Sequence, residues 1–552
     1  MKKRYPFSTK KCFAPGLLFL LATFFSGNLF AQVAPVKHWD KTFGGSSNDE
    51  LRSLKQTADG GYILAGSSHS GNSGDKSEPN RHPFNSNTAD YWVVKLDATG
   101  NKIWDKTFGG DAHDALSAMQ QTSDGGYILA GSSSSGLTGD RSQANNGLVD
   151  FWILKLDSAG TKQWDQAFGG SQTNRATSIQ QTADGGYIIG GSSNSGVSGH
   201  KSQPNLGSDD YWIVKTDAAG NKLWDKTFGT SSKETLNSIY QTSDGGYILA
   251  GTSEGSIGGD KTGASRGGAD YWVVKTDANG LKQWDKTFGG NGADEAFSIC
   301  QTSDGGYLLG GSSASSILSG DKSQPSKGGF DYWVIKLAAN GNLIWDRSFG
   351  GAGNDRLLSL QQTRSGNFIL GGYSDSGTSS NKTQPRIGSV DYWVIELNSI
   401  GNQLWDMTLG GTSQNALWEI RQTSDSGFIL GGYSNSGISG DKSQATKGGY
   451  DYWIVKLGFG ALGKPEEIFT GNLTLFPNPS HGKFNLQLTG LTAPTAEVTV
   501  TDLLGRAVLQ QQFKTTQAQL SEEITLPAAA TGMYLLQVKT GGKITSRKIV
   551  VE

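Results

Sequence analysis

The sequence predicts an all-β protein, a seven-bladed β-propeller closed by an N-terminal strand and followed by a small Ig-like β-sandwich. A unit of about 60 residues recurs seven times, and each copy contains four strand-like segments separated by turn residues. The repeat stops near the C-terminus, where a segment with a different sequence pattern begins. With 79 glycines, 13 prolines and 18% charged residues among 552, the composition favours short strands joined by turns over long helices.

The N-terminus predicts a secretory signal peptide over residues 1–31. It combines the basic start MKKR, an apolar run over residues 16–25 and the small residue Ala31 at the expected cleavage position. The apolar run is too short for a transmembrane span, and no later stretch approaches the required length. We therefore expect a chain that is exported and that has no transmembrane span.

The repeat region, residues 38–458, predicts seven blades of four antiparallel strands. Each copy reads WDKTFGG, a segment ending in QT, a DGG turn, YILAG, a Ser/Gly-rich loop and DYWVVKLD with a tight turn. The glycines of the DGG turns should adopt positive backbone dihedrals at the first hairpin. Copy six departs from the pattern with Ser365, Gly366 and Asn367.

The ends of the repeat region predict a closed ring rather than a linear solenoid. Copy seven ends after its third strand, over residues 451–457, while the mature chain begins with an unpaired fourth strand around Trp39. Pairing these two segments would complete one blade and close the ring without a covalent link. Of the two cysteines, Cys12 leaves with the signal peptide, so Cys300 has no partner for a disulfide.

Fourteen of the fifteen tryptophans recur at two fixed positions in each copy, one in the third strand and one in the fourth. Such regular recurrence predicts core packing between blades rather than a cofactor site. Trp418 is the one tryptophan outside the pattern, near the start of the seventh innermost strand. It is therefore a candidate for a ligand contact that breaks the sevenfold symmetry, although packing is the simpler interpretation.

The wording of the repeat resembles a known family. The segments FGGSSNDELRSLKQTADGGYILAGSS and ADYWVVKLDATGNKIWDKTFGG resemble the SBBP family of seven-bladed β-propeller repeats, and the likeness extends over residues 38–458. This resemblance implies the same propeller architecture.

A different module follows a predicted linker at residues 459–471. Alternating apolar and polar residues over 472–552 predict a small β-sandwich. Its motifs resemble the type A C-terminal sorting domain of the Bacteroidetes type IX secretion system. The matching positions are Phe476, Pro477, Asn478, Pro479, Gly505, Arg506, Gly532, Tyr534 and Lys548. The resemblance implies Sec export to the periplasm, passage through the type IX machinery, and release or attachment at the cell surface.

An acid or amide stands ten residues after each fourth-strand tryptophan, where the innermost strand of a blade begins. These residues are Asp49, Asp114, Asn174, Glu234, Asp294, Asp355 and Asn415. One interpretation is an oxygen-rich ring at the channel mouth that holds a hard cation such as calcium. The simpler one, which we favour, is that each side chain hydrogen-bonds the adjacent glycine turn.

Other recurring charges are interpreted as parts of loops and turns. A basic residue follows position 75 and its equivalents in every long loop, and we interpret these bases as solvated charges with internal pairing. The aspartates that open each third strand, Asp90 and its equivalents, are interpreted as turn caps. Cys300 has no recurring histidine beside it, so we expect an inert thiol.

We therefore expect a secreted or surface-attached propeller that binds an extracellular glycan or protein without catalysis. The alternative is a glycan hydrolase or lyase with paired carboxylates at the channel mouth. The formal charge of −2 gives no field to attract nucleic acid. No cofactor is expected apart from the calcium considered above, and the one partner that a motif indicates is the type IX secretion machinery.

Overall fold

The computed structural model describes residues 34–82, 88–316, 320–459, 467–468, 472–491, 493–502, 507–515, 518–526, 531–541 and 543–552. The chain divides into two compact units, one formed by Ala34–Lys464 and one that contains Pro465–Glu552. Every regular secondary-structure element in the described ranges is a β-strand, so the protein is all-β. The predicted signal peptide and most of the predicted linker lie outside these ranges. Within them, no helix is long and apolar enough to cross a membrane.

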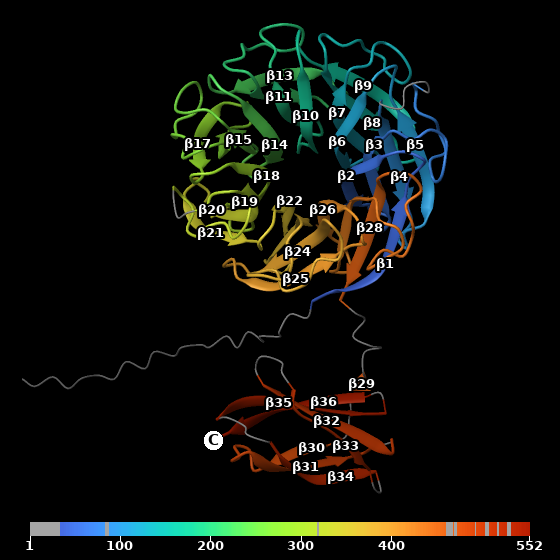
Figure 1. The fold of residues 1–552 in the computed structure, drawn as a ribbon, viewed down its shortest axis with the longest axis vertical. Helices are drawn as coiled ribbons and strands as arrows, with labels where there is room; N and C mark the ends of the chain where they lie inside the picture. Colours follow the sequence, from blue (N-terminus) through green and yellow to red (C-terminus); the bar gives the residue numbers. More distant parts are fainter. Residues whose placement is uncertain are drawn as a thin grey trace, which may run out of the picture. The chain divides into compact units, whose positions relative to one another are not determined.

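The first unit contains seven four-stranded antiparallel sheets, six of them built from consecutive strands. These six are β2 (Asp49–Gln56), β3 (Tyr62–Ser68), β4 (Asp90–Leu96) and β5 (Lys102–Phe108); β6 (Asp114–Gln121), β7 (Tyr127–Ser133), β8 (Asp150–Leu156) and β9 (Lys162–Phe168); β10 (Asn174–Gln181), β11 (Tyr187–Ser193), β12 (Asp210–Thr216) and β13 (Lys222–Phe228); β14 (Glu234–Gln241), β15 (Tyr247–Ser253), β16 (Asp270–Thr276) and β17 (Lys282–Phe288); β18 (Asp294–Gln301), β19 (Tyr307–Ser313), β20 (Asp331–Leu337) and β21 (Leu343–Phe349); β22 (Asp355–Gln362), β23 (Phe368–Ser374), β24 (Asp391–Leu397) and β25 (Gln403–Leu409). The seventh combines β26 (Asn415–Gln422), β27 (Phe428–Ser434) and β28 (Asp451–Gly458) with β1 (Val36–Phe43). The sheets form a propeller-like ring, with β2, β6, β10, β14, β18, β22 and β26 nearest the centre (Figure 1).

The seventh sheet joins the two ends of the repeat region, as the incomplete last copy predicts. β1 pairs antiparallel with β28 from Val36↔Gly458 to Phe43↔Tyr452. The Asp40 carboxylate of β1 also accepts hydrogen bonds from the Trp453 indole (3.2 Å) and from the Ser443 backbone N–H (2.8 Å). The prediction that residues around Trp39 complete the last sheet is therefore confirmed. This pairing covers an edge strand that would otherwise expose unpaired backbone groups.

The first hairpin of each sheet turns at a residue with positive φ. Gly60 has φ of 81°, and its equivalents through Gly366 have similar values, while Ser426 takes the place in copy seven at 67°. The Asp59 side chain accepts a hydrogen bond from the Gly61 N–H (2.9 Å) and pairs with Lys95 (2.9 Å). The predicted turn geometry is thus confirmed.

Copy six replaces this pair of charges with a different network. Ser365 stands where the other copies have Asp, and Glu396 stands where they have Lys. The Asn367 side-chain amide donates to Glu396 (2.9 Å), and the Trp405 indole donates to the other oxygen of the same carboxylate (2.7 Å). Asn367 and Trp405 therefore stabilise the carboxylate that replaces the lysine.

Aromatic side chains join neighbouring sheets. The third-strand tryptophans are fully buried, and each stacks on an aromatic ring of the preceding sheet, as Trp333 does on Tyr271 at 4.8 Å. The Tyr271 hydroxyl donates to the Trp333 carbonyl (3.1 Å), and the other sheets repeat this bond except where Phe151 replaces the tyrosine. The predicted packing role of these tryptophans is confirmed.

The exception at Phe151 allows a test of the inter-sheet hydrogen bond. We expect Tyr271→Phe to lower the free energy of unfolding by about 1 kcal/mol, because it removes one buried hydrogen bond and keeps the ring. Phe151→Tyr, which can form the missing bond to the Trp212 carbonyl, is the converse variant. Chemical denaturation measures both, and no change in either would show that the rings alone join the sheets.

A second set of bonds joins the sheets at the hairpin end. The side-chain oxygen of the last glutamine in each innermost strand accepts a hydrogen bond from a turn N–H of the preceding sheet. Gln56 forms this bond with Ser424 (2.7 Å) across the junction between the first and seventh sheets. All seven junctions therefore contain the same glutamine-to-backbone hydrogen bond, including the junction that closes the ring.

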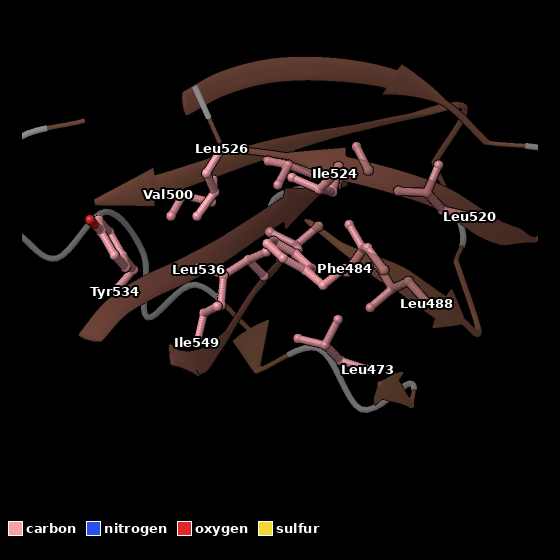
Figure 2. Packing of buried hydrophobic residues seen from close by; sticks show 14 of the residues in the cluster. Leu473, Phe484, Leu488, Val500, Leu520, Ile524, Leu526, Tyr534, Leu536 and Ile549 are labelled. Atoms are coloured by element: carbon pink, nitrogen blue, oxygen red, sulfur yellow. The ribbon is translucent and has the colours of Figure 1, made fainter. Parts of the chain in front are cut away.

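The second unit contains two sheets that enclose one apolar core. The larger sheet has β29 (Glu467–Ile468), β32 (Thr495–Asp502), β33 (Ala507–Lys514), β35 (Gly532–Thr540) and β36 (Lys543–Val551). The smaller has β30 (Leu473–Phe476), β31 (Lys483–Thr489) and β34 (Gln519–Thr525). Phe484, Leu488 and Leu536 are among the side chains that pack between the sheets (Figure 2). The alternating pattern of the sequence produces this arrangement, because one face of each strand points inward.

Candidate functional site: the central channel

A cavity of about 900 Å³ is lined by the innermost strand of all seven sheets. Serine, threonine, asparagine and glutamine side chains supply most of its polar lining. Among the described residues of the lining, the acidic side chains and those of lysine and arginine all come from two strands, β2 and β26. They are Glu50, Arg52, Lys55, Glu419 and Arg421. The channel therefore mixes polar groups with apolar side chains such as Phe297 and Leu358, and it is charged on one side, at the junction where the ring closes.

Arg52 and Trp418 form a platform in this charged part of the lining. The Arg52 guanidinium lies 3.8 Å from the centroid of the Trp418 ring, and it forms an ion pair with Glu50 (2.6 Å). A cation over an aromatic face is attracted by the ring quadrupole. The structure thus places Trp418, the tryptophan outside the repeat pattern, on the channel wall beside a cation.

Glu419 binds two bases in the channel wall. Its side chain forms ion pairs with Lys55 and with Arg421 (2.6 Å), and it accepts a hydrogen bond from the Ser53 hydroxyl (2.9 Å). Burial raises the pKa of Glu419, but the charges of Lys55 and Arg421 outweigh this effect and lower the pKa to about 2. Burial also lowers the pKa of Lys55 to about 8. Glu419 is therefore ionised at neutral pH and unsuited to act as a general acid.

Two other titratable groups of the lining are held in their neutral forms. Burial raises the pKa of the Cys300 thiol to about 11, so little of the nucleophilic thiolate exists at neutral pH. Burial and the neighbouring His69 lower the pKa of His113, whose Nδ1 accepts a hydrogen bond from the Ala89 N–H (3.1 Å). The two imidazole rings lie 6.1 Å apart. Cys300 is thus placed as an unreactive part of the wall.

The candidate ring residues lie inside the sheet junctions and outside the channel lining. All seven are fully buried, namely Asp49, Asp114, Asn174, Glu234, Asp294, Asp355 and Asn415. Each accepts a hydrogen bond from a serine hydroxyl, as Asp49 does from Ser70 (2.9 Å). Asp49 also accepts one from the Gly45 N–H (2.7 Å). In the part of the chain that the structure describes, no group of three or more His, Cys, Asp or Glu side chains could hold a metal ion.

The bases of the long loops are buried, so their interpretation as solvated charges was wrong. Lys76 is 1% exposed, and its ammonium donates to the Thr107 hydroxyl (2.7 Å) and the Glu78 carbonyl (2.7 Å). Burial lowers its pKa to about 8. The equivalent bases are buried as well, namely Arg141, Lys201, Lys261, Lys322, Lys382 and Lys442. The loops fold back over these side chains, and local composition does not reveal this.

In the second unit, the motif residues lie near the C-terminal strand. The Asn478 side chain donates to the Lys548 carbonyl (2.8 Å) and accepts from the Val550 N–H (2.8 Å), so it fixes the end of β36. Gly532 begins β35, and Tyr534 is 8% exposed in the core. Pro477 and Pro479 flank Asn478, and Phe476 is 45% exposed. Gly505 and Arg506 lie outside the described residues.

Residues 474–552 match the family described as the secretion system C-terminal sorting domain, Por_Secre_tail. The C-terminal module is thus similar to secretion-system sorting domains. It indicates export by the type IX secretion system to the cell surface or the extracellular space, and it implies contact with the secretion machinery. The predicted location and the predicted partner machinery are thereby supported.

Three further proteins are similar to this chain. The regulatory protein FlaEY of Caulobacter vibrioides is 24% identical over 388 residues, which cover 65% of this chain and 39% of that protein. Puromycin hydrolase superposes with a TM-score of 0.41 at 10% identity, over 82% of this chain and 60% of that one. A DUF4221 protein from Bacteroides vulgatus gives 0.30 at 10% identity, over 66% and 98% of the two chains. The chain spans less than half the length of FlaEY.

The repeat pattern reveals Trp418 but not the ion cluster around Glu419. Glu419 stands where the other copies have serine or alanine, and Arg52 stands where they have Ser117, Thr177 or other uncharged residues. Comparing the copies position by position along the innermost strand would have revealed these two exceptions. Their proximity required the ring closure, because β2 and β26 are far apart in the sequence.

Proposed function

We propose that the chain is an exported seven-bladed β-propeller that binds an extracellular macromolecule at its central channel without catalysis. In this proposal residues 1–31 are a signal peptide, residues 38–458 form the propeller, and residues 472–552 form an Ig-like sandwich that directs secretion. The linker is residues 459–471. The sorting-domain match supports the export part of the proposal.

The charged side of the channel is the observation that carries the binding role. A site for one ligand requires a feature that the seven copies do not share, and the residues from β2 and β26 supply it. Arg52 over Trp418 offers a planar surface on which a sugar ring or an aromatic side chain can stack. Hydroxyl and amide side chains around the rest of the channel suit a polar ligand. Glycans are therefore the first class to test.

The geometry favours binding over glycan hydrolysis. A glycosidase requires two carboxyl groups, one of which is protonated when the reaction begins. The carboxyl groups of the described channel lining are Glu50 and Glu419, and both form ion pairs with arginine. A pKa of about 2 makes Glu419 a poor proton donor.

A glycan array probed with the mature full-length chain tests this proposal. For a glycan that binds, we expect Arg52→Ala to weaken the affinity about tenfold in isothermal titration, a loss of about 1.4 kcal/mol. Arg347→Ala is the matched control, because Arg347 also lies over a tryptophan, Trp345, but outside the channel lining. Equal weakening by both variants, or by neither, would contradict a site at the channel. Binding to proteins but to no glycan would change the ligand class.

A further inference from the structure

Each junction between neighbouring sheets contains a buried pair of polar side chains that the repeat pattern does not explain. One member begins the innermost strand of a sheet, and the other is the aspartate that begins the third strand of the preceding sheet. Asn415 and Asp391 form one such pair, and Asp49 and Asp451 form the pair at the ring closure. All of these residues are 0% exposed.

Where the first member is asparagine, its amide fills a gap surrounded by oxygen atoms. The Asn415 Nδ2 donates to Asp391 Oδ1 (3.2 Å) and lies within hydrogen-bond distance of the Val390 (3.1 Å), Gly411 (3.2 Å) and Ser413 (3.2 Å) carbonyls. The Asn174 amide does the same with Asp150 (3.2 Å) and the carbonyls of Val149 and Gln172. This gap thus requires a donor or a positive charge.

Four junctions have aspartate as the first member, and the amide donor is missing there. At one of them Asp294 Oδ1 still accepts a hydrogen bond from the Ser315 hydroxyl (3.3 Å), so that junction is not counted as a site. In three junctions the Oδ1 atoms of both aspartates are buried without a hydrogen-bond partner, namely Asp49 with Asp451, Asp114 with Asp90, and Asp355 with Asp331. The other oxygen of each carboxylate is satisfied, as Asp451 Oδ2 is by the Lys447 N–H (2.6 Å). A buried acceptor without a partner is costly, and two facing each other are more so.

Neighbouring bases do not fill this gap. The charge of Lys442 acts on Asp451, but the Lys442 ammonium donates to the Thr42 hydroxyl (2.5 Å) and the Gln444 carbonyl (2.6 Å). Lys76, near Asp49 and Asp90, donates to Thr107 and Glu78 instead. The oxygen atoms of each acidic pair therefore remain without a cationic partner from the protein.

We propose that these three junctions bind hard metal cations of the calcium type, one in each. The ligands at the ring closure are Asp49 Oδ1, Asp451 Oδ1 and the carbonyl oxygens of Gly45, Ser47 and Tyr450, which are equivalent to those around the Asn415 amide. Calcium takes oxygen ligands from carboxylates and backbone carbonyls at about 2.3–2.6 Å, and adjacent ligands in such a shell are about 3 Å apart. The spacings of 3.1–3.2 Å around the Asn415 amide match that separation. The sites are separate, so they differ from a single ion held by a ring at the channel mouth.

The pKa values agree with a demand for positive charge at these positions. Burial, together with the neighbouring Asp114, raises the pKa of Asp90 to about 7. Burial also raises the pKa of Asp114 to about 6. A shared proton would satisfy the same demand, but an O–H···O⁻ bond needs about 2.5–2.7 Å between the oxygens, shorter than the 3.2 Å of the equivalent amide pairs.

Metal content of the mature full-length chain tests the inference. After incubation with calcium and desalting, we expect elemental mass spectrometry to give about three calcium ions per chain. This number equals the number of aspartate pairs in which both Oδ1 atoms lack a hydrogen-bond partner. EDTA should remove them and lower Tm. The triple variant D49N/D114N/D355N should bind none, and its Tm should not respond to EDTA. Asparagine already occupies two of the junctions, so these substitutions suit the fold.

Asn174→Asp provides the converse test, because it should create a fourth site by the same rule. Calcium retained in the triple variant, or an unchanged stoichiometry in Asn174→Asp, would overturn the inference. Absence of calcium from the original chain, with a Tm that does not respond to calcium but falls as pH rises from 4 to 7, would replace the metal by a shared proton.

Discussion

Deleting residues 34–43 is expected to open the ring and to remove most of the stability of the first unit. β1 pairs with β28 along its whole length, and it buries Phe43 and supplies the Asp40 carboxylate to the Trp453 indole. Its loss exposes an edge strand and leaves buried donors without partners. We expect a loss of roughly 5 kcal/mol or more, comparable with the whole stability of a typical domain. Calorimetry should show a lower Tm or no cooperative transition.

A rearranged chain is the control for this deletion. Residues 36–43 moved to follow Gly458 through a short flexible linker would offer the same strand to β28 from the other end of the chain. We expect this variant to recover a cooperative transition, because the pairing needs the strand and not its original connection. If the deletion variant unfolds at the original Tm, pairing of β1 with β28 does not hold the ring closed.

Removing the carboxylate of Glu419 is expected to have the second largest effect. Glu419→Ala leaves Lys55 and Arg421 facing each other in the channel wall without a counter-charge. We expect a loss of about 1–3 kcal/mol, because Lys55 and Arg421 remain partly exposed while the Ser53 hydroxyl and the Leu54 N–H lose their buried acceptor. Glu50→Gln is the matched control, since Glu50 pairs with the partly exposed Arg52 and such pairs contribute about 0–1 kcal/mol. Urea unfolding measures both variants.

The same residue predicts a dependence of stability on pH. The pKa of Glu419 in the folded protein is lowered to about 2 from 4.5, so its contribution is fully present above the unfolded pKa. That contribution should be lost as pH falls from about 4.5 towards 2. The original chain should therefore lose more stability over this range than Glu419→Ala. Parallel curves for the two proteins would contradict the ionic role of Glu419.

The sequence predicted the strands and the closure because both depend on periodicity. A fixed repeat determines where each strand begins, and an incomplete last copy leaves a definite partner for the residues around Trp39. The identity of the buried tryptophans followed from the same regularity. Export followed from the motif around Asn478, whose side chain fixes the end of the C-terminal strand.

The contacts of the charged residues could not be predicted from the repeat, because they join residues that are far apart in the sequence. Lys76 looked like a solvated loop base, but its loop folds back so that the ammonium reaches Thr107. Asp49 does hydrogen-bond the adjacent glycine turn through the Gly45 N–H, but its second oxygen is buried without a partner, which no local pattern indicates. The pair of Glu419 and Lys55 joins residues from opposite ends of the repeat region, so it becomes visible only when the ring is closed.

A combined binding and turnover assay tests the central claim most directly. The mature chain would be incubated with each glycan that it retains on an array, and both the bound fraction and the release of new reducing or unsaturated sugar ends would be followed over time. A non-catalytic channel predicts saturable retention that Arg52→Ala weakens, with no new ends above the rate of the glycan alone. New ends that form in proportion to protein concentration, and that disappear in Glu419→Gln, would contradict the claim and identify an enzyme.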